Sequence, residues 1–200
     1  MNSAYMGDSY DLVKRFIVTQ LAPLGPWSVH PMFTDQVSTE TAHLFSHLVG
    51  APLLSTETLT GSTDLEEYLS CCATADHVLL DPDTGVRLGG SRPSVAHLPA
   101  ATLSAVVRAR PSALTAVFDQ SFNRGQHDPE LRAKLEYFRQ RGIHGFGYRS
   151  HACFLFLSPS EACIAEAWRL LTDVLPPDRL VGRHVADDAP ASAPHESSEG

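Results

Sequence analysis

The sequence predicts an α/β fold of three layers, in which helices cover both faces of a mostly parallel sheet and a C-terminal antiparallel hairpin closes the chain. Short apolar runs typical of buried strands alternate along the chain with longer segments of helical periodicity. The last two strand-like runs are separated by only three residues, too few for a parallel crossover, so we expect them to form a hairpin that supplies one antiparallel strand at the edge of the sheet. We expect residues 1–181 to form a single α/β domain.

Apolar stripes and end signals predict the helices. Over residues 9–21, Phe16, Ile17 and Leu21 recur at helical spacing, and Pro23 follows the end. Later helices begin at capping-type residues or at a proline and end near glycine. These helices are expected over residues 38–50, 64–72, 99–107, 128–142 and 158–175.

Short, branched and apolar runs predict the strands, and each is bounded by turn-forming residues. Residues 83–94, "DTGVRLGGSRPS", are interpreted as a long glycine-rich loop. The segment from residue 182 to 200 is rich in Ala, Pro, Ser and acidic residues without apolar periodicity, so we expect a disordered tail. The expected strands are residues 27–30, 77–80, 113–118, 143–148 and 152–157.

Composition restricts the classes of function. The net charge of −8 and the pI near 5.6 argue against strong nonspecific binding of nucleic acid. No secretory signal and no bilayer-length apolar stretch is visible, and the four cysteines form no C-x-x-C motif, so we expect a cytoplasmic protein with reduced thiols. The chain has 13 arginines and only two lysines, which we interpret as the codon usage of a GC-rich bacterial genome.

Polar side chains follow several of the predicted strands. Asp81 and Asp83 follow the run "HVLL" and flank a proline, and Asp119 follows "TAVF". Ligands in open α/β sheets bind outside the carboxyl ends of the strands, so we expect these groups to share one rim. The strand-end residues Arg149, Ser150 and His151, together with His30 on the first strand, belong to the same predicted rim.

Carboxylates at two strand ends are suitable ligands for Mg²⁺ or Mn²⁺, which prefer oxygen donors. Our first hypothesis is metal-assisted phosphoester chemistry on a nucleotide or nucleic acid. Asp81 and Asp119 would bind the metal, and Asp81, Asp83 and His151 would be the catalytic groups. Arg124, Arg149 and Ser150 would contact the substrate. The alternative for "DPDTG" is an ordinary acidic turn.

The order of elements resembles the Rossmann-like core of class I methyltransferases, and the "DPDTG" strand end resembles that of uncharacterised bacterial proteins. The first resemblance implies S-adenosylmethionine as cofactor, and it places "LLDPD" where many amino-methyltransferases carry an Asp-Pro-Pro-aromatic loop. That family's glycine-rich loop is replaced here by "SVHPMFTDQ", which contains no glycine and favours an altered cofactor site or none.

Two further functions therefore remain as alternatives, a divergent methyltransferase-like protein and a noncatalytic binding or assembly module. His43 and His47 stand four residues apart on a predicted helix, a spacing that can bind metal, but no third ligand is obvious and we interpret them as surface polar groups. Cys153 beside His151 could form a thiol–imidazole pair, but it lies within an apolar strand.

Overall fold

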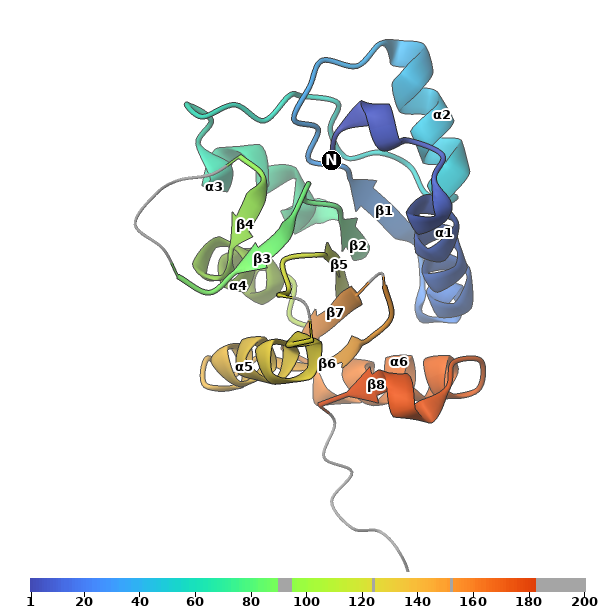
Figure 1. The fold of residues 1–200 in the computed structure, drawn as a ribbon, viewed down its shortest axis with the longest axis vertical. Helices are drawn as coiled ribbons and strands as arrows, with labels where there is room; N and C mark the ends of the chain where they lie inside the picture. The colour runs from blue at the N-terminus through green and yellow to red at the C-terminus, as the bar shows by residue number, and fades with distance from the viewer. Residues whose placement is uncertain (90–94, 124, 152, 183–200) are drawn as a thin grey trace, which may run out of the picture.

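A computed structural model describes residues 1–89, 95–123, 125–151 and 153–182. The prediction of a mixed α/β protein is confirmed (Figure 1). The helices are α1 (Ser9–Leu21), α2 (Thr39–Val49), α3 (Leu65–Tyr68), α4 (Ala100–Arg108), α5 (His127–Arg139) and α6 (Glu161–Thr172), with 3₁₀ turns η1 (Ser3–Tyr5), η2 (Ala22–Leu24), η3 (Ser70–Thr74) and η4 (Pro177–Arg179).

The main sheet has six strands in the order β1-β2-β5-β7-β6-β8. Neighbours β1, β2 and β5 pair in parallel, whereas β5 with β7, β7 with β6, and β6 with β8 pair antiparallel. Four strands therefore run in one direction and two in the other. The bounds are β1 (Trp27–His30), β2 (His77–Leu80), β5 (Thr115–Asp119), β6 (His144–Tyr148), β7 (Cys153–Ser158) and β8 (Leu180–Val181).

The antiparallel strand β7 was expected at the edge of the sheet, and this expectation is wrong. It lies inside the sheet, between β5 and β6, and all six of its residues are buried. Phe154 and Phe156 join one apolar core and Leu155 and Leu157 join the other. A strand with apolar side chains on both faces is stable only where both faces are covered, which the interior position provides.

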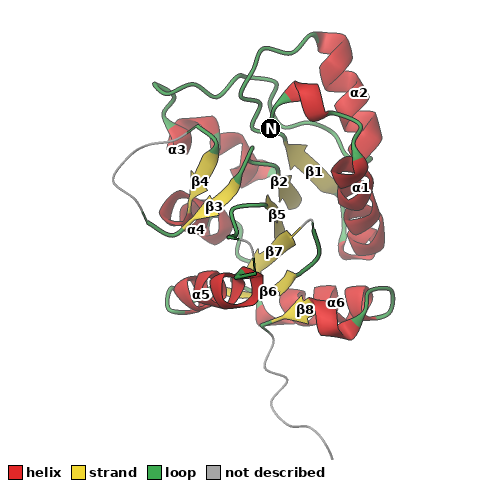
Figure 2. Cartoon of the chain, viewed as in Figure 1, coloured by secondary structure: helices red, strands yellow, loops and turns green. Residues whose placement is uncertain are grey.

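Helices pack on both faces of the sheet (Figure 2). One core contains Ile17 of α1, Phe45 of α2 and Ile164 of α6. The opposite core contains Leu103 of α4 and Phe138 of α5. The alternation of side chains along β2, β5 and β7 divides the apolar residues between these cores.

The predicted loop over residues 83–94 is wrong in its first part. Residues Gly85–Arg87 form strand β3, which pairs in parallel with β4 (His97–Pro99) in a separate two-stranded sheet beside the main one (Figure 1). Its position depends on contacts with Asp119, which lies 34 residues further along the chain than Gly85. The predicted tail beyond residue 182 lies outside the described residues.

Candidate functional site

The carboxyl ends of β1 and β2 lie side by side. The two strands are in register at His30 and Leu80, and the backbone N–H of Asp81 donates to the carbonyl of His30 at 3.0 Å. The N-terminal segment reaches the same end, because the Met1 amino group donates to the carbonyl oxygens of Met32 (2.6 Å) and Asp81 (3.3 Å). Asp81 therefore lies at a junction of three chain segments.

Asp81 belongs to a buried ionic bridge between α1 and β2. Lys14 Nζ donates to Asp81 Oδ2 at 2.7 Å and to Asp11 Oδ1 at 2.9 Å, and each of the three residues is less than 5% exposed. The ammonium also lies 4.5 Å from the centroid of the Phe118 ring. Such a bridge is tolerated in a core because the ammonium donates to both carboxylates, which offsets part of the cost of burying the charges.

Burial and charge act against each other within this bridge. Burial lowers the pKa of Lys14, but the carboxylates of Asp81 and Asp11 outweigh it and raise that pKa above its usual value. Burial raises the pKa of the Asp81 carboxyl more than Lys14 lowers it. Lys14 therefore holds its proton, which makes it a counter-ion for the carboxylates and a poor nucleophile.

A cavity of about 290 Å³ adjoins the bridge at the carboxyl end of β2. Asp11, Lys14 and Asp81 form part of its wall, and Asp83 of the loop after β2 adds a half-buried carboxylate. The remaining lining residues are Met1, Asn2, Tyr5, Asp8, Tyr10, Pro82, Phe118 and Gln120. Its volume is near the lower limit for small-molecule sites.

Asp119 takes part in a second buried contact, separate from the first. Its Oδ2 accepts from Lys134 Nζ at 2.6 Å, and its Oδ1 accepts from the backbone N–H groups of Val86 (3.1 Å) and Ser121 (3.0 Å) and from the Ser121 hydroxyl (2.6 Å). Lys134 lies 4.0 Å from the centroid of the Phe122 ring. This carboxylate fixes β3 and α5 to the end of β5, so we interpret it as structural.

These contacts weigh against the predicted metal site at Asp81 and Asp119. Asp81 pairs with Lys14 and Asp119 pairs with Lys134, so the two carboxylates belong to separate ion pairs and are not arranged around one shared cation. Within the described ranges, no group of three or more His, Cys, Asp or Glu side chains could hold a metal ion. The donor set therefore does not fit Mg²⁺ or Mn²⁺, which require several oxygen ligands around one centre.

The other predicted site residues do not all come together. Arg149 donates to Asp128 at 3.0 Å and to the carbonyl of Asp178 at 3.2 Å, so its guanidinium joins α5 to η4. His151 is exposed and lies 5.3 Å from Tyr10 between ring centroids, near the cavity but not in its wall. Ser150 is half-buried and does not line the cavity either. The predicted substrate contact Arg124 lies outside the described residues.

The buried thiol of Cys153 does not fit a nucleophile. It donates to the carbonyl of Ser150 at 3.4 Å, and burial raises the pKa of the Cys153 thiol. A nucleophilic cysteine requires the opposite shift, toward the thiolate.

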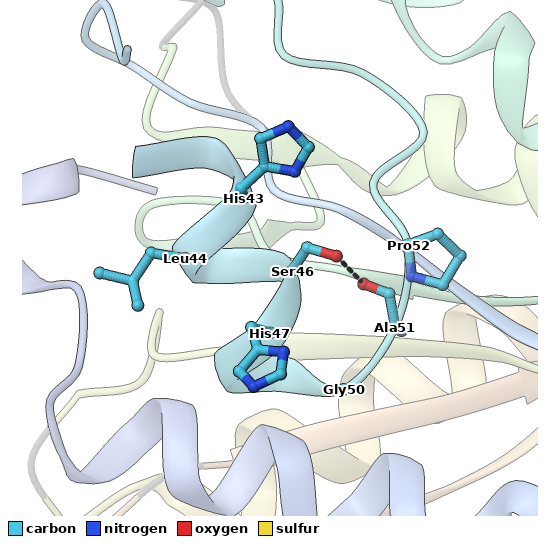
Figure 3. Close-up of a pocket in the computed structure, with 7 residues that line it drawn as sticks. All are labelled: His43, Leu44, Ser46, His47, Gly50, Ala51 and Pro52. Atoms are coloured by element: carbon cyan, nitrogen blue, oxygen red, sulfur yellow. Dashed lines mark hydrogen bonds between the residues drawn. The ribbon is translucent and has the colours of Figure 1, made fainter. Parts of the chain in front are cut away.

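The two histidines of α2 line a different and larger surface depression of about 740 Å³. Figure 3 shows His43, Ser46 and His47 on α2, with the Ser46 hydroxyl donating to the carbonyl of Ala51 at 2.9 Å. Both imidazoles are exposed, and the other lining residues, Leu44, Gly50, Ala51 and Pro52, offer no metal-ligating side chain. Surface polar groups remain the interpretation of this pair.

The segment after β1 does not fit a cofactor loop of the methyltransferase type. Met32 and Phe33 are fully buried, and Phe33 lies 5.9 Å from Phe45 between ring centroids. Met32 has φ 48°, the left-handed region that favours glycine. The side chains fill the space where a glycine loop would admit a ligand, so the residues present do not fit S-adenosylmethionine there.

Asp11, Lys14 and Lys134 were not predicted as site residues from the sequence. A signal for the lysines existed: they are the only two in the chain, and each lies within the apolar stripe of its helix, Lys14 before Ile17 and Lys134 between Leu131 and Phe138. A lone lysine on an apolar face must be paired when it is buried. Asp81 and Asp119 were the strand-end partners available.

Comparisons with protein-family models, with curated proteins and with solved structures found no match to this chain. In the part of the chain that the structure describes, no helix has both the length and the apolar character needed to cross a bilayer.

Proposed function

We propose that this protein is a small-molecule-binding module with a Rossmann-like three-layer fold, and that its site is the cavity at the carboxyl end of β2. The observation that carries the proposal is the position of that cavity: it lies at the strand end where open α/β sheets bind ligands, and a buried Lys14–Asp81 pair forms its wall. A buried ionic group that borders a cavity is also a recognised indicator of a functional site.

Ligand binding without a metal ion agrees best with the residues that line the cavity. Phosphoester chemistry would require a cation or a positive lining to hold a phosphate, but the cavity carries four aspartates and one lysine among its side chains. The strand order supports a proposed resemblance in fold to class I methyltransferase cores. The buried side chains of Met32 and Phe33 after β1 argue against binding of S-adenosylmethionine. The noncatalytic alternative is therefore preferred to both enzyme hypotheses.

A thermal-shift panel tests this proposal. It should contain MgCl₂, MnCl₂, S-adenosylmethionine, inorganic phosphate and small organic compounds of each charge. We expect a saturable rise in Tm with at least one small organic compound and none with the metals or S-adenosylmethionine. A rise with Mg²⁺ that is lost in Asp81→Asn would restore the metal hypothesis, and a rise with S-adenosylmethionine would restore the methyltransferase hypothesis. No rise with any compound would overturn the proposal.

A further inference from the structure

The cavity at the carboxyl end of β2 has a strongly negative lining. Four aspartates contribute to it, Asp8, Asp11, Asp81 and Asp83, and Lys14 is the one basic side chain in the wall. Four negative charges and one positive charge leave a net charge of −3 on the side chains, and −2 when the Met1 ammonium is included. A cleft lined by one sign of charge raises the local concentration of ligands of the opposite sign.

Hydrogen-bond acceptors in this wall remain unused by the protein. Asp81 is 1% exposed, and Lys14 occupies its Oδ2, but Oδ1 accepts no hydrogen bond from the described part of the chain. A carboxylate oxygen that borders a cavity and receives no donor from the protein can accept a hydrogen bond from a ligand that brings an N–H group. The Asp83 carboxylate also accepts no hydrogen bond and forms no ion pair within the described residues, and it lines the same cavity.

Aromatic rings complete the wall. Tyr10 and Phe118 lie 5.4 Å apart between ring centroids, and Tyr5 is the third ring in the lining. The faces of such rings attract cations, as Lys14 demonstrates with its ammonium 4.5 Å from the Phe118 centroid. Carboxylates and ring faces together select for an organic cation, since an anion would be repelled by the carboxylates.

We propose that the cavity binds a small protonated alkylamine, with the ammonium hydrogen-bonded to Asp81 and Asp83 and the alkyl part against Tyr10 and Phe118. This inference rests on the proposed function and names the ligand class of the same site. The cavity volume of about 290 Å³ has room for roughly ten water-sized groups, which restricts the ligand to a small amine.

Three probes of similar size, with five or six non-hydrogen atoms, and of different charge test the inference by calorimetric titration of the full chain: n-butylammonium, n-pentanol and butyrate. We expect n-butylammonium to bind most tightly and its affinity to fall as salt is added. Binding of n-pentanol or butyrate in preference to n-butylammonium would overturn the alkylamine proposal and leave the proposed binding function standing. No binding by any of the three would overturn the alkylamine proposal, and the proposed binding function would then stand only if the thermal-shift panel yields another ligand.

A second experiment measures n-butylammonium binding to variants that change the charge around the cavity. Asp83→Asn should weaken n-butylammonium binding roughly three- to tenfold, because it removes one half-buried charge beside the ligand. Gln120→Glu should tighten binding and Gln120→Lys should weaken it, since Gln120 lines the cavity and is exposed. The matched control is Asp76→Asn, the same charge change just before the other end of β2, and it should leave the affinity unchanged. Equal effects of Asp83→Asn and Asp76→Asn would contradict the assigned site.

Discussion

Lys14 and Lys134 are each buried on the apolar face of a helix, and each contacts one strand-end aspartate. Removal of one partner from such a pair leaves an uncompensated charge in the core, which costs more than the pair itself contributes. At the scale of single residues, these two contacts explain why Asp81 and Asp119 follow buried strands. They also explain why, of these two aspartates, Asp81 remains a candidate for ligand binding and Asp119 does not: Asp81 lines the cavity and keeps one carboxylate oxygen without a donor from the described residues.

Replacement of Lys14 by methionine should lower the free energy of unfolding by about 3–5 kcal/mol, because Asp11 and Asp81 would lose their common counter-ion. Urea denaturation followed by circular dichroism measures the change. The control Arg15→Met alters the next residue, which is exposed, and should change stability by less than about 0.5 kcal/mol. Similar losses in both variants would show that the buried bridge is not stabilising.

His30 predicts a pH dependence of stability. It is fully buried, Met32 N–H donates to its Nδ1 at 3.4 Å, and its Nε2 lies 3.3 Å from the carbonyl of Tyr68. Burial lowers the pKa of His30 to about 4, from an ordinary value near 6.5 in the unfolded chain. As the pH falls, the unfolded chain therefore protonates this histidine before the folded protein does. The neutral His30 contributes about 3 kcal/mol to the free energy of unfolding above pH 6.5, and this contribution is lost as the pH falls toward 4.

Denaturation of wild type and His30→Gln at several pH values measures this contribution. The difference in unfolding free energy between the two proteins should shrink as the pH falls from 6.5 to 4. His144→Gln, which alters an exposed histidine, should run parallel to wild type over the same range. A constant difference between wild type and His30→Gln would contradict the depressed pKa.

At the scale of elements, the segment "DPDTG" connects the two buried aspartates. It leaves β2 at Asp81 and enters β3 at Gly85, which packs directly on Asp119. The Gln120 N–H donates to the Thr84 carbonyl at 2.8 Å, which holds the segment against the end of β5. The two interpretations of this stretch, a site or a turn, therefore apply to different residues: Asp81 and Asp83 border the cavity, while Thr84 and Gly85 make the structural connection.

Gly85→Ala should destabilise the protein by about 2–4 kcal/mol. Gly85 has φ +127°, and a Cβ added there would lie 2.0 Å from Asp119 Oδ1 and 2.9 Å from its backbone Cα. Gly61→Ala is the matched control, because a Cβ there meets nothing within 4 Å. Urea denaturation should show a clearly lower free energy of unfolding for Gly85→Ala than for Gly61→Ala. A loss of stability in Gly85→Ala no larger than in Gly61→Ala would contradict the close packing of Gly85 on Asp119.

At the scale of the whole molecule, the sequence predicted those helices and strands whose formation depends on residues within the segment itself. The helix over residues 9–21 and the strand over residues 77–80 are confirmed to the residue, because periodicity, branching and capping signals are contained within each segment. The place of β7 between β5 and β6 is set by pairing with segments far along the chain, and the edge position predicted for an antiparallel strand was therefore wrong.

The candidate site could be predicted in part for the same reason. The rule that ligands bind at strand carboxyl ends led to Asp81 and Asp83, and both line the cavity. The rule could not reveal that Lys14 on α1 would reach Asp81 across 67 residues of sequence, or that Lys134 would neutralise Asp119. Local sequence carries the residue types, but the pairing of charges depends on which helix packs over which strand end.

The most direct test of the central claim is an amide ¹H–¹⁵N NMR titration of the full chain with n-butylammonium, n-pentanol and butyrate in turn. If the cavity is the binding site, the largest chemical-shift changes will lie at the N–H groups of Asp81, Asp83 and Gln120, and n-butylammonium will cause the largest of them. The claim would be contradicted if none of the three compounds moved these signals, or if the changes lay instead at His43 and Gly50 beside the depression on α2.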